Sequence, residues 1–193
     1  MSSTKEKIIQ ASLELFSEYG HKVTTVKMIA KKIDVNELTI YRHFGSKEKI
    51  IEEIIYAIPR FEPHLVDFFI NQVVYDLETD LRNFAKLIIE ISQNNYIFLK
   101  LLINNLDLKE KSYMNKNDRN RVKEELHHYF KQMETMGKVI SLDIDSLNLL
   151  LYSTVEGAFL LIDKFGHSEI HDINWDLYIE SWVNLFVRGL EVR

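Results

Sequence analysis

Apolar residues recur every three or four positions along most of the chain, which is the spacing of helices rather than strands. Residues 5–19 carry the first such repeat, Gly20 would end it, and Ser3 with Glu6 has the spacing of a capping box. The apolar side of this helix would comprise Ile8, Ile9, Ala11, Ser12, Leu15, Phe16 and Tyr19.

Two much shorter helices are predicted next. The first would cover about Val26–Ile33 with Thr24 as its cap, and the second would run from about Asn36, as its cap, to His43. Gly45 would end the second helix. Two short helices joined by a tight turn are what a helix-turn-helix motif requires.

The rest of the chain predicts a larger helical body. A fourth helix over residues 47–57, capped by Ser46, would lead into it, and Pro59 and Pro63 would break or kink the connection. The polar segment Asn104–Asn120 is predicted to be a loop with at most a helical turn. Periodic apolar positions predict further helices over about 77–91, 98–102, 122–133, 147–165 and 175–190.

The last two of these helices carry more apolar residues than one buried face needs. Leu147–Phe165 is apolar nearly all round, and aromatic and aliphatic residues repeat at helical spacing in Trp175–Leu190. Helices of this kind usually have neighbours on more than one side. We therefore expect the pair to join two copies of the chain, and a central helix of a monomer is the alternative.

Composition agrees with an all-α fold of about nine helices. The 193 residues are 46% hydrophobic and 27% charged, and with 6 Gly and 2 Pro they hold too little turn chemistry for a many-stranded sandwich or barrel. The chain has no cysteine, which excludes disulfides, thiolate metal sites and a thiol nucleophile. No apolar leader or membrane-spanning run is present, so we expect a cytoplasmic protein.

The charge is unevenly distributed along the chain. The net charge is −5, yet residues 1–56 hold nine Lys and Arg against eight Asp and Glu, which leaves the acidic excess to the remainder. Contact with nucleic acid would therefore be local and confined to the N-terminal end.

The N-terminal segment resembles the DNA-binding domain of the tetracycline-repressor-like (TetR) family in residues and spacing. The resemblance rests on the apolar run from Ile8 to Phe16 with Gly20, on Thr24-Thr25-Val26, and above all on Tyr41-Arg42-His43-Phe44-Gly45-Ser46-Lys47-Glu48. It covers about residues 5–56. It implies a three-helix helix-turn-helix domain over 1–50, with the fourth helix linking to an effector-binding and dimerisation domain over 51–193.

Two groups of DNA-contacting residues follow. A hydroxyl at a helix start makes Thr25 a candidate phosphate ligand, Lys27 is a further one, and the resemblance implies the same role for Tyr41, His43 and Lys47. Exposed positions of the second short helix would read bases, namely Glu37, Leu38, Thr39 and Arg42. This chain has Asp34 where the family commonly has Gly, and Glu37 and Leu38 where it often has small or basic residues, so the operator sequence does not carry over.

The resemblance also implies a small-molecule pocket in the body. Candidate lining residues are Phe61, Phe68, Phe84, Glu90, Tyr96, Phe98, Tyr113 and Phe159, although aromatic residues at helical spacing are more often core. Polar residues within apolar runs, among them Asn94, Asn104, Asn105 and Glu156, are further clues because burying them without a partner is costly. For Glu156 we favour a place in the dimer interface.

The sequence thus predicts a homodimeric regulator that binds operator DNA, responds to a small-molecule effector and needs no cofactor or metal. The alternative keeps the fold but makes it a DNA-bound scaffold or an activator controlled by a protein partner. An enzyme is disfavoured, because no phosphate-binding loop, nucleophile elbow or compact acid–base pair is present.

Overall fold

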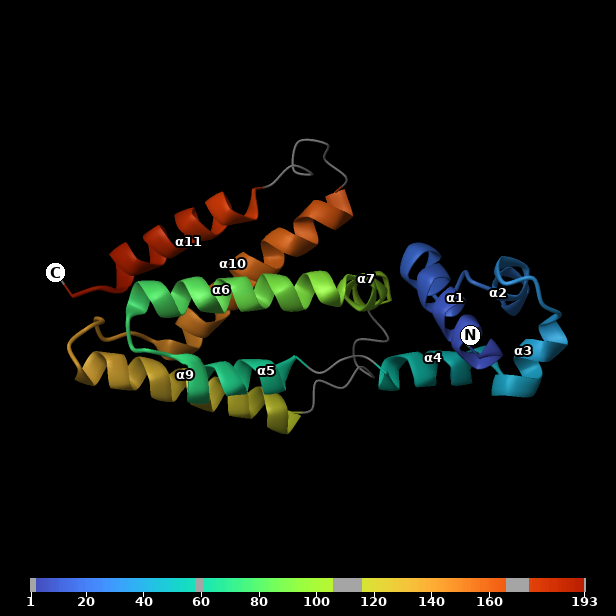
Figure 1. Cartoon of the computed structure of the whole chain (residues 1–193), viewed down its shortest axis with the longest axis horizontal. Helices are drawn as coiled ribbons and strands as arrows, with labels where there is room; N and C mark the ends of the chain where they lie inside the picture. Colours follow the sequence, from blue (N-terminus) through green and yellow to red (C-terminus); the bar gives the residue numbers. More distant parts are fainter. Residues whose placement is uncertain (1–2, 58–60, 106–115, 166–173, 193) are drawn as a thin grey trace. The chain divides into compact units, whose positions relative to one another are not determined.

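The computed structural model of the chain describes residues 3–57, 61–105, 116–165 and 174–192 (Figure 1). Within these ranges it contains ten α-helices and one π-helical segment, which confirms the all-α prediction. None of these helices combines the length and the apolar character needed to cross a membrane. Backbone contacts group the chain into two compact units, an N-terminal unit of residues 1–60 and 95–114 and a C-terminal unit of residues 61–94 and 115–193. The predicted functional boundary at residue 50 stays a prediction.

The N-terminal unit consists of four consecutive helices and one from further along the chain. These are α1 (Thr4–Tyr19), α2 (Val26–Lys32), α3 (Glu37–Phe44), α4 (Lys47–Tyr56) and α7 (Tyr96–Asn104). Ile8, Ile29, Ile50 and Ile54 are fully buried at its centre, and Leu101 brings α7 into the same core. Packing of α7 against α1 therefore completes a core that the first four helices share.

Most predicted helix ends of this unit are confirmed. The capping box of α1 is formed, with Ser3 N–H donating to Glu6 at 2.9 Å and Glu6 N–H donating to Ser3 Oγ at 3.2 Å. Asn36 accepts from the backbone N–H of Leu38, and Ser46 caps α4 in the same manner. Gly20 follows α1 with a φ of 82°, which a residue with a Cβ rarely adopts.

Two expectations for the first helices were wrong. The cap of α2 is Thr25, whose hydroxyl accepts from the N–H of Met28 at 3.2 Å, and not Thr24. Thr24 is instead buried and donates to the carbonyl of Gly20 at 2.9 Å, so its hydroxyl secures the turn before α2. Tyr19 is 50% exposed because α1 ends there and its side chain lies off the packed face.

The C-terminal unit contains the remaining helices. They are α5 (Glu62–Asp67), the π-helical segment η1 (Phe68–Gln72), α6 (Leu77–Asn94), α9 (Lys116–Thr135), α10 (Ile144–Phe165) and α11 (Trp175–Leu190). Pro63 lies in the first turn of α5, where its missing N–H needs no partner, so it starts a helix instead of breaking one. The polar stretch predicted as a loop is helical from Lys116 onward, whereas Pro59 lies outside the described residues.

A buried carboxylate organises one end of this unit. Asp80 is 2% exposed, accepts a hydrogen bond from the Tyr129 hydroxyl at 2.9 Å and accepts another from the N–H of Val74 at 2.9 Å. Burial and the charge of Asp80 raise the pKa of Tyr129, so the phenol keeps its proton and remains a donor. Each buried polar atom of this cluster is thus paired, as the interior requires.

Candidate nucleic-acid interface

The turn between α2 and α3 sets the direction of the second helix. Asp34 adopts a left-handed backbone with a φ of 54°, and the N–H of Val35 donates to the carbonyl of Ala30 at 3.0 Å. Aspartate tolerates this conformation better than most residues with a Cβ, which explains how it can replace glycine here. The two helices therefore form the tight helix-turn-helix arrangement that the sequence predicts.

One face of α3 is fixed in the core and the other faces solvent. Ile40 is 1% exposed and Phe44 is 8% exposed, so these two residues hold the helix down. Leu38 is 55% exposed and Tyr41 is 47% exposed. Arg42 and His43 are exposed too, whereas the predicted base-reading residues Glu37 and Thr39 are half-buried. An apolar, an aromatic and two basic or titratable side chains thus stand together on an outer face of one short helix.

The start of α2 offers a second exposed group. Thr25 and Lys27 are both exposed, and Thr25 stands at the first turn of the helix, where its hydroxyl already accepts from Met28. The hydroxyl hydrogen of Thr25 is still able to donate to an external oxygen. Thr25 and Lys27 are therefore accessible to an external ligand, and their phosphate contacts stay a prediction.

Lys47 lies in a different environment from the other predicted phosphate ligands. Its ammonium group donates to the carbonyl of His21 at 2.7 Å and to the carbonyl of Thr24 at 2.9 Å, and its side chain is half-buried. Both carbonyls belong to the loop between α1 and α2. Lys47 thus ties the start of α4 to that loop from within the N-terminal unit.

The same loop is held from a second side by Asn105, which follows α7. Asn105 is 2% exposed, and its side-chain carbonyl accepts from the N–H of His21 at 2.7 Å while its amide donates to the carbonyl of Phe16 at 3.2 Å. The ring Nδ1 of His21 lies 2.7 Å from the same oxygen. We call Lys47, His21 and Asn105 the polar junction, because together they connect α1, α4 and α7.

Sequence reasoning missed the polar junction. Asn105 stands out as a polar residue after an apolar run, but its partner His21 is 84 positions away, a separation that periodicity cannot bridge. The signal that could have found it is the cost of burying an amide, which requires partners somewhere in the fold.

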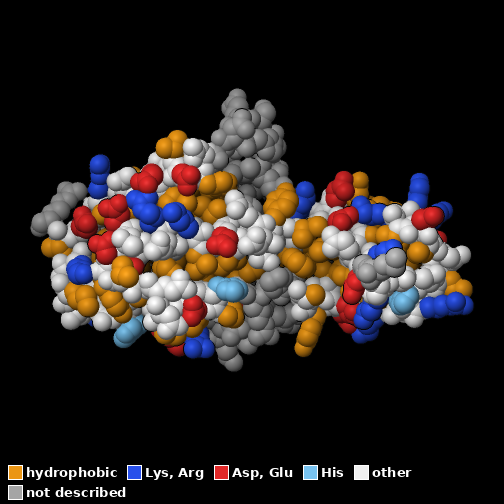
Figure 2. Space-filling view, in the orientation of Figure 1, with side chains coloured by type: hydrophobic (Ala, Val, Ile, Leu, Met, Phe, Trp, Pro, Cys, Tyr) orange, Lys and Arg blue, Asp and Glu red, His pale blue; other side chains and the backbone are white. Residues whose placement is uncertain are grey.

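Charge on the N-terminal unit is mixed. Lys5 pairs with Glu53 at 2.8 Å and Lys32 pairs with Glu14 at 2.9 Å, and the hydrogen bond from Lys32 lowers the pKa of Glu14. Figure 2 likewise shows acidic and basic side chains interspersed on the face that it presents. Phosphates would therefore be met by a few individual donors and not by a dense basic patch.

The predicted pocket residues are divided between the two units, and their role stays a prediction. Phe68 and Phe84 are buried in the C-terminal unit with ring centroids 6.1 Å apart, and Phe61 is half-buried. Glu90 is exposed on α6. Tyr96 and Phe98 belong to α7 of the N-terminal unit, whereas Tyr113 and the side chain of Phe159 lie outside the described residues.

Comparison with known proteins agrees with this geometry. Residues 8–54 match the family model described as bacterial regulatory proteins, tetR family. The chain is 37% identical over 81 residues to the HTH-type transcriptional regulator UidR of Escherichia coli K12. That match covers 37% of this chain and 41% of UidR, so the chain spans about two fifths of that relative. It is 24% identical over 187 residues to IcaR, the negative regulator of the biofilm operon icaADBC in Staphylococcus aureus Newman, covering 95% of this chain and 99% of IcaR.

Solved structures of low identity share the fold over the full length. PfmR of Thermus thermophilus matches with a TM-score of 0.63 at 22% identity and covers 100% of both chains. The ketosteroid regulator KstR2 of Mycobacterium tuberculosis matches with a TM-score of 0.70 at 14% identity, covering 100% of this chain and 97% of its own. A transcriptional regulator of Saccharomonospora viridis in complex with choline matches with a TM-score of 0.65 at 15% identity over 100% of both chains.

The fold and the exposed face of α3 define a helix-turn-helix protein of the DNA-binding class. The family model matches this motif over residues 8–54, so the N-terminal helices form a DNA-binding domain of the TetR type, and the chain is similar to TetR family transcriptional regulators along its length. This family is not enzymatic.

Proposed function

We propose that this chain is a repressor that binds a near-palindromic operator as a homodimer and leaves it when a small molecule binds the C-terminal unit. The observation that carries the proposal is the outer face of α3, where Leu38, Tyr41 and Arg42 stand exposed above a helix anchored by Ile40 and Phe44. An exposed helix face of this length fits the major groove of B-form DNA.

Each exposed residue has a role in this proposal. Leu38 would touch a thymine methyl group and Arg42 would donate to a guanine, with Glu37 and Thr39 completing the base-reading set. Thr25, Lys27, Tyr41 and His43 would contact phosphates and so fix the register without reading sequence. For Lys47 we propose a supporting role, since two carbonyls of the α1–α2 loop already receive its ammonium group.

The proposed dimer is supported by large apolar side chains that lie exposed on the last two helices. On α10, Leu149 is 70% exposed and Leu150 is 53% exposed. On α11, Leu177 is 64% exposed and Leu185 is 73% exposed. Exposed leucines at this density are typical of a surface that a partner covers, and two-fold dimers are the commonest way for a protein to cover one.

Only the similarity to TetR regulators supports the proposal that an effector exists. Some members bind small molecules, as the choline complex of the Saccharomonospora viridis regulator illustrates. Differential binding of this kind typically changes DNA affinity by about 5- to 150-fold.

The test is footprinting of the DNA upstream of the chain's own gene, with and without a metabolite extract. A protected near-palindrome that becomes accessible when the extract is added is the expected result. Protection that no fraction of the extract changes would contradict the small-molecule part of the proposal, and absence of any protected site would contradict control of its own gene.

A further inference from the structure

A buried side-chain amide joins three separate segments of the N-terminal unit. Asn105, which follows α7, is 2% exposed, and its amide nitrogen donates to the carbonyl of Phe16 at 3.2 Å and to that of Leu101 at 2.7 Å. Its oxygen accepts from the backbone N–H of His21 at 2.7 Å, and the ring Nδ1 of His21 lies 2.7 Å from the same oxygen. Both donors and both acceptor positions of the amide are therefore in use.

These partners decide which nitrogen of the His21 ring carries a hydrogen. The two carbonyls can only accept and the backbone N–H of His21 can only donate, so the amide nitrogen and oxygen of Asn105 cannot exchange places. The oxygen of Asn105 has no hydrogen to offer. Nδ1 of His21 must therefore be the donor, and the bond to Asn105 selects that tautomer of the neutral ring.

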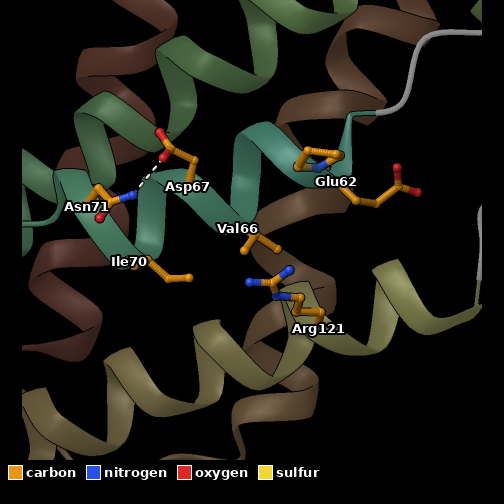
Figure 3. Close-up of a pocket in the computed structure, with 7 residues that line it drawn as sticks. Glu62, Val66, Asp67, Ile70, Asn71 and Arg121 are labelled. Carbon is orange, nitrogen blue, oxygen red and sulfur yellow. Dashed lines mark hydrogen bonds between the residues drawn. The ribbon is translucent and has the colours of Figure 1, made fainter.

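Other side-chain amides of the described chain bond close to their own position. Asn71 donates to Asp67 at 2.7 Å, four residues away, and Figure 3 shows this bond beside the hollow between α5 and α9. Gln10 donates to Glu14 over the same separation. Asn105 instead reaches a residue 84 positions away. A bond of that span serves the tertiary arrangement and not the needs of one helix.

The loop that Asn105 holds leads directly to a proposed DNA contact. The carbonyls of His21 and Thr24 receive the same ammonium group, that of Lys47. Thr25 comes next in the chain, caps α2 and is exposed. The position of the Thr25 hydroxyl therefore depends on the loop, and the polar junction bonds that loop to α4 and α7.

The helix proposed to read bases has anchors of another kind. Ile40 is 1% exposed and Phe44 is 8% exposed, so apolar burial holds α3 in the core of the unit. Release of the α1–α2 loop therefore acts on the start of α2 and leaves the outer face of α3 in place.

We propose that Asn105 is a positioning residue for DNA binding, which holds the α1–α2 loop to α7 through His21 and so places the Thr25 hydroxyl against a phosphate. Asn105 is buried and acts without touching DNA. The phosphate contact proposed for Thr25 is the part of the proposed function on which this inference rests.

The test is a double-mutant cycle on the affinity of the full chain for a random-sequence DNA duplex, which suffices because phosphate contacts do not read sequence. In the parent, Thr25→Ala should weaken binding about tenfold for each reader, the loss of one hydrogen bond to a charged group. In Asn105→Ala the same change should cost less than about threefold, because the contact is already lost. Tyr41→Phe should cost the same factor in both backgrounds, since Tyr41 belongs to α3.

The cycle separates this inference from the proposed function. An equal cost of Thr25→Ala in the parent and in Asn105→Ala would overturn the positioning role and keep the phosphate contact. No cost of Thr25→Ala in the parent would contradict the phosphate contact and the inference with it.

Two control variants exclude a general loss of stability as the cause. Ile8→Val removes a methyl group from the fully buried core of the same unit, and Asn71→Ala removes an amide that bonds locally. Both should keep the full cost of Thr25→Ala, and a reduced cost in Ile8→Val would overturn the inference. His21→Phe decides the matter if Asn105→Ala does not fold, because it removes only the ring donor. It should reduce the cost of Thr25→Ala by a smaller factor, and an unchanged cost would count against the positioning role.

Nitrogen NMR of the His21 ring provides a measurement that needs no DNA. At a pH where the ring is neutral, the parent should carry its hydrogen on Nδ1, and Asn105→Ala should shift the hydrogen toward Nε2. A neutral parent ring with its hydrogen on Nε2 would show that the bond to Asn105 is not made and would overturn the inference.

Discussion

Replacing Lys47 by methionine tests whether this residue supports the DNA-binding domain or contacts DNA. Methionine keeps most of the length and apolar character of the lysine stem and removes the ammonium group. That group donates to the carbonyls of His21 and Thr24 at 2.7 and 2.9 Å, so Lys47→Met leaves two part-buried carbonyls of the α1–α2 loop without their donor.

The expected loss is set by two charge-assisted hydrogen bonds. Such bonds contribute about 1.5–3 kcal/mol each when well shielded, and because Lys47 is only half-buried we take the lower end. Two bonds at about 1.5 kcal/mol each mean that Lys47→Met should lower the free energy of unfolding by about 3 kcal/mol. Urea titration followed by circular dichroism is the suitable assay, because both tryptophans, Trp175 and Trp182, belong to the C-terminal unit and would not report on this region.

Salt dependence of DNA binding discriminates between the two roles. A lysine that neutralises one phosphate contributes about 0.9 to the slope of log affinity against log salt concentration, whereas a supporting lysine contributes nothing to it. We expect Lys47→Met to bind more weakly at every salt concentration with the parent slope. Lys49→Met is the matched control on α4, since Lys49 is exposed and pairs with the exposed Glu52, and its stability should not change measurably. Parent stability combined with a slope reduced by about one would refute the supporting role and make Lys47 a phosphate ligand.

Three further predictions follow from the same structure. Leu38→Ala and Arg42→Ala should change which bases are preferred in a randomised half-site library, at a cost of about 1–3 kcal/mol per lost contact, and unchanged preferences would mean that α3 does not read bases. Asp34→Gly should raise the free energy of unfolding by about 0.5–1 kcal/mol in urea titration, because glycine adopts a φ of 54° without steric cost, and a decrease would contradict this account. The parent should sediment near twice 22.9 kDa and Leu185→Glu near 22.9 kDa, so a monomeric parent would rule out the proposed dimer.

The helix boundaries of the N-terminal unit could be predicted because their causes are local. Ser3, Asn36 and Ser46 each cap a helix through atoms two or three residues away, and Gly20 ends α1 through its own backbone. The wrong prediction that Thr24 caps α2 also has a local cause. Two adjacent threonines offer the same hydroxyl, and only the packing of the turn decides that Thr24 is buried and that the next residue caps α2.

The candidate sites were less predictable because they depend on distant partners. Tyr96 and Phe98 belong to α7, which packs against α1 in the N-terminal unit, whereas Phe68 and Phe84 belong to the C-terminal unit. Periodicity identifies which side of a helix is apolar without stating which helix covers it.

Because of the polar junction, a loss of DNA affinity in a variant of this domain has two alternative causes, a lost DNA contact or a displaced loop. The loop before α2, which leads into the proposed DNA-reading motif, is secured by Lys47 from α4 and by Asn105 after α7. Neither residue needs to touch DNA for its loss to weaken binding. Affinity alone therefore cannot separate a contact from a support, whereas the salt slope can, because only a group that displaces counterions changes it.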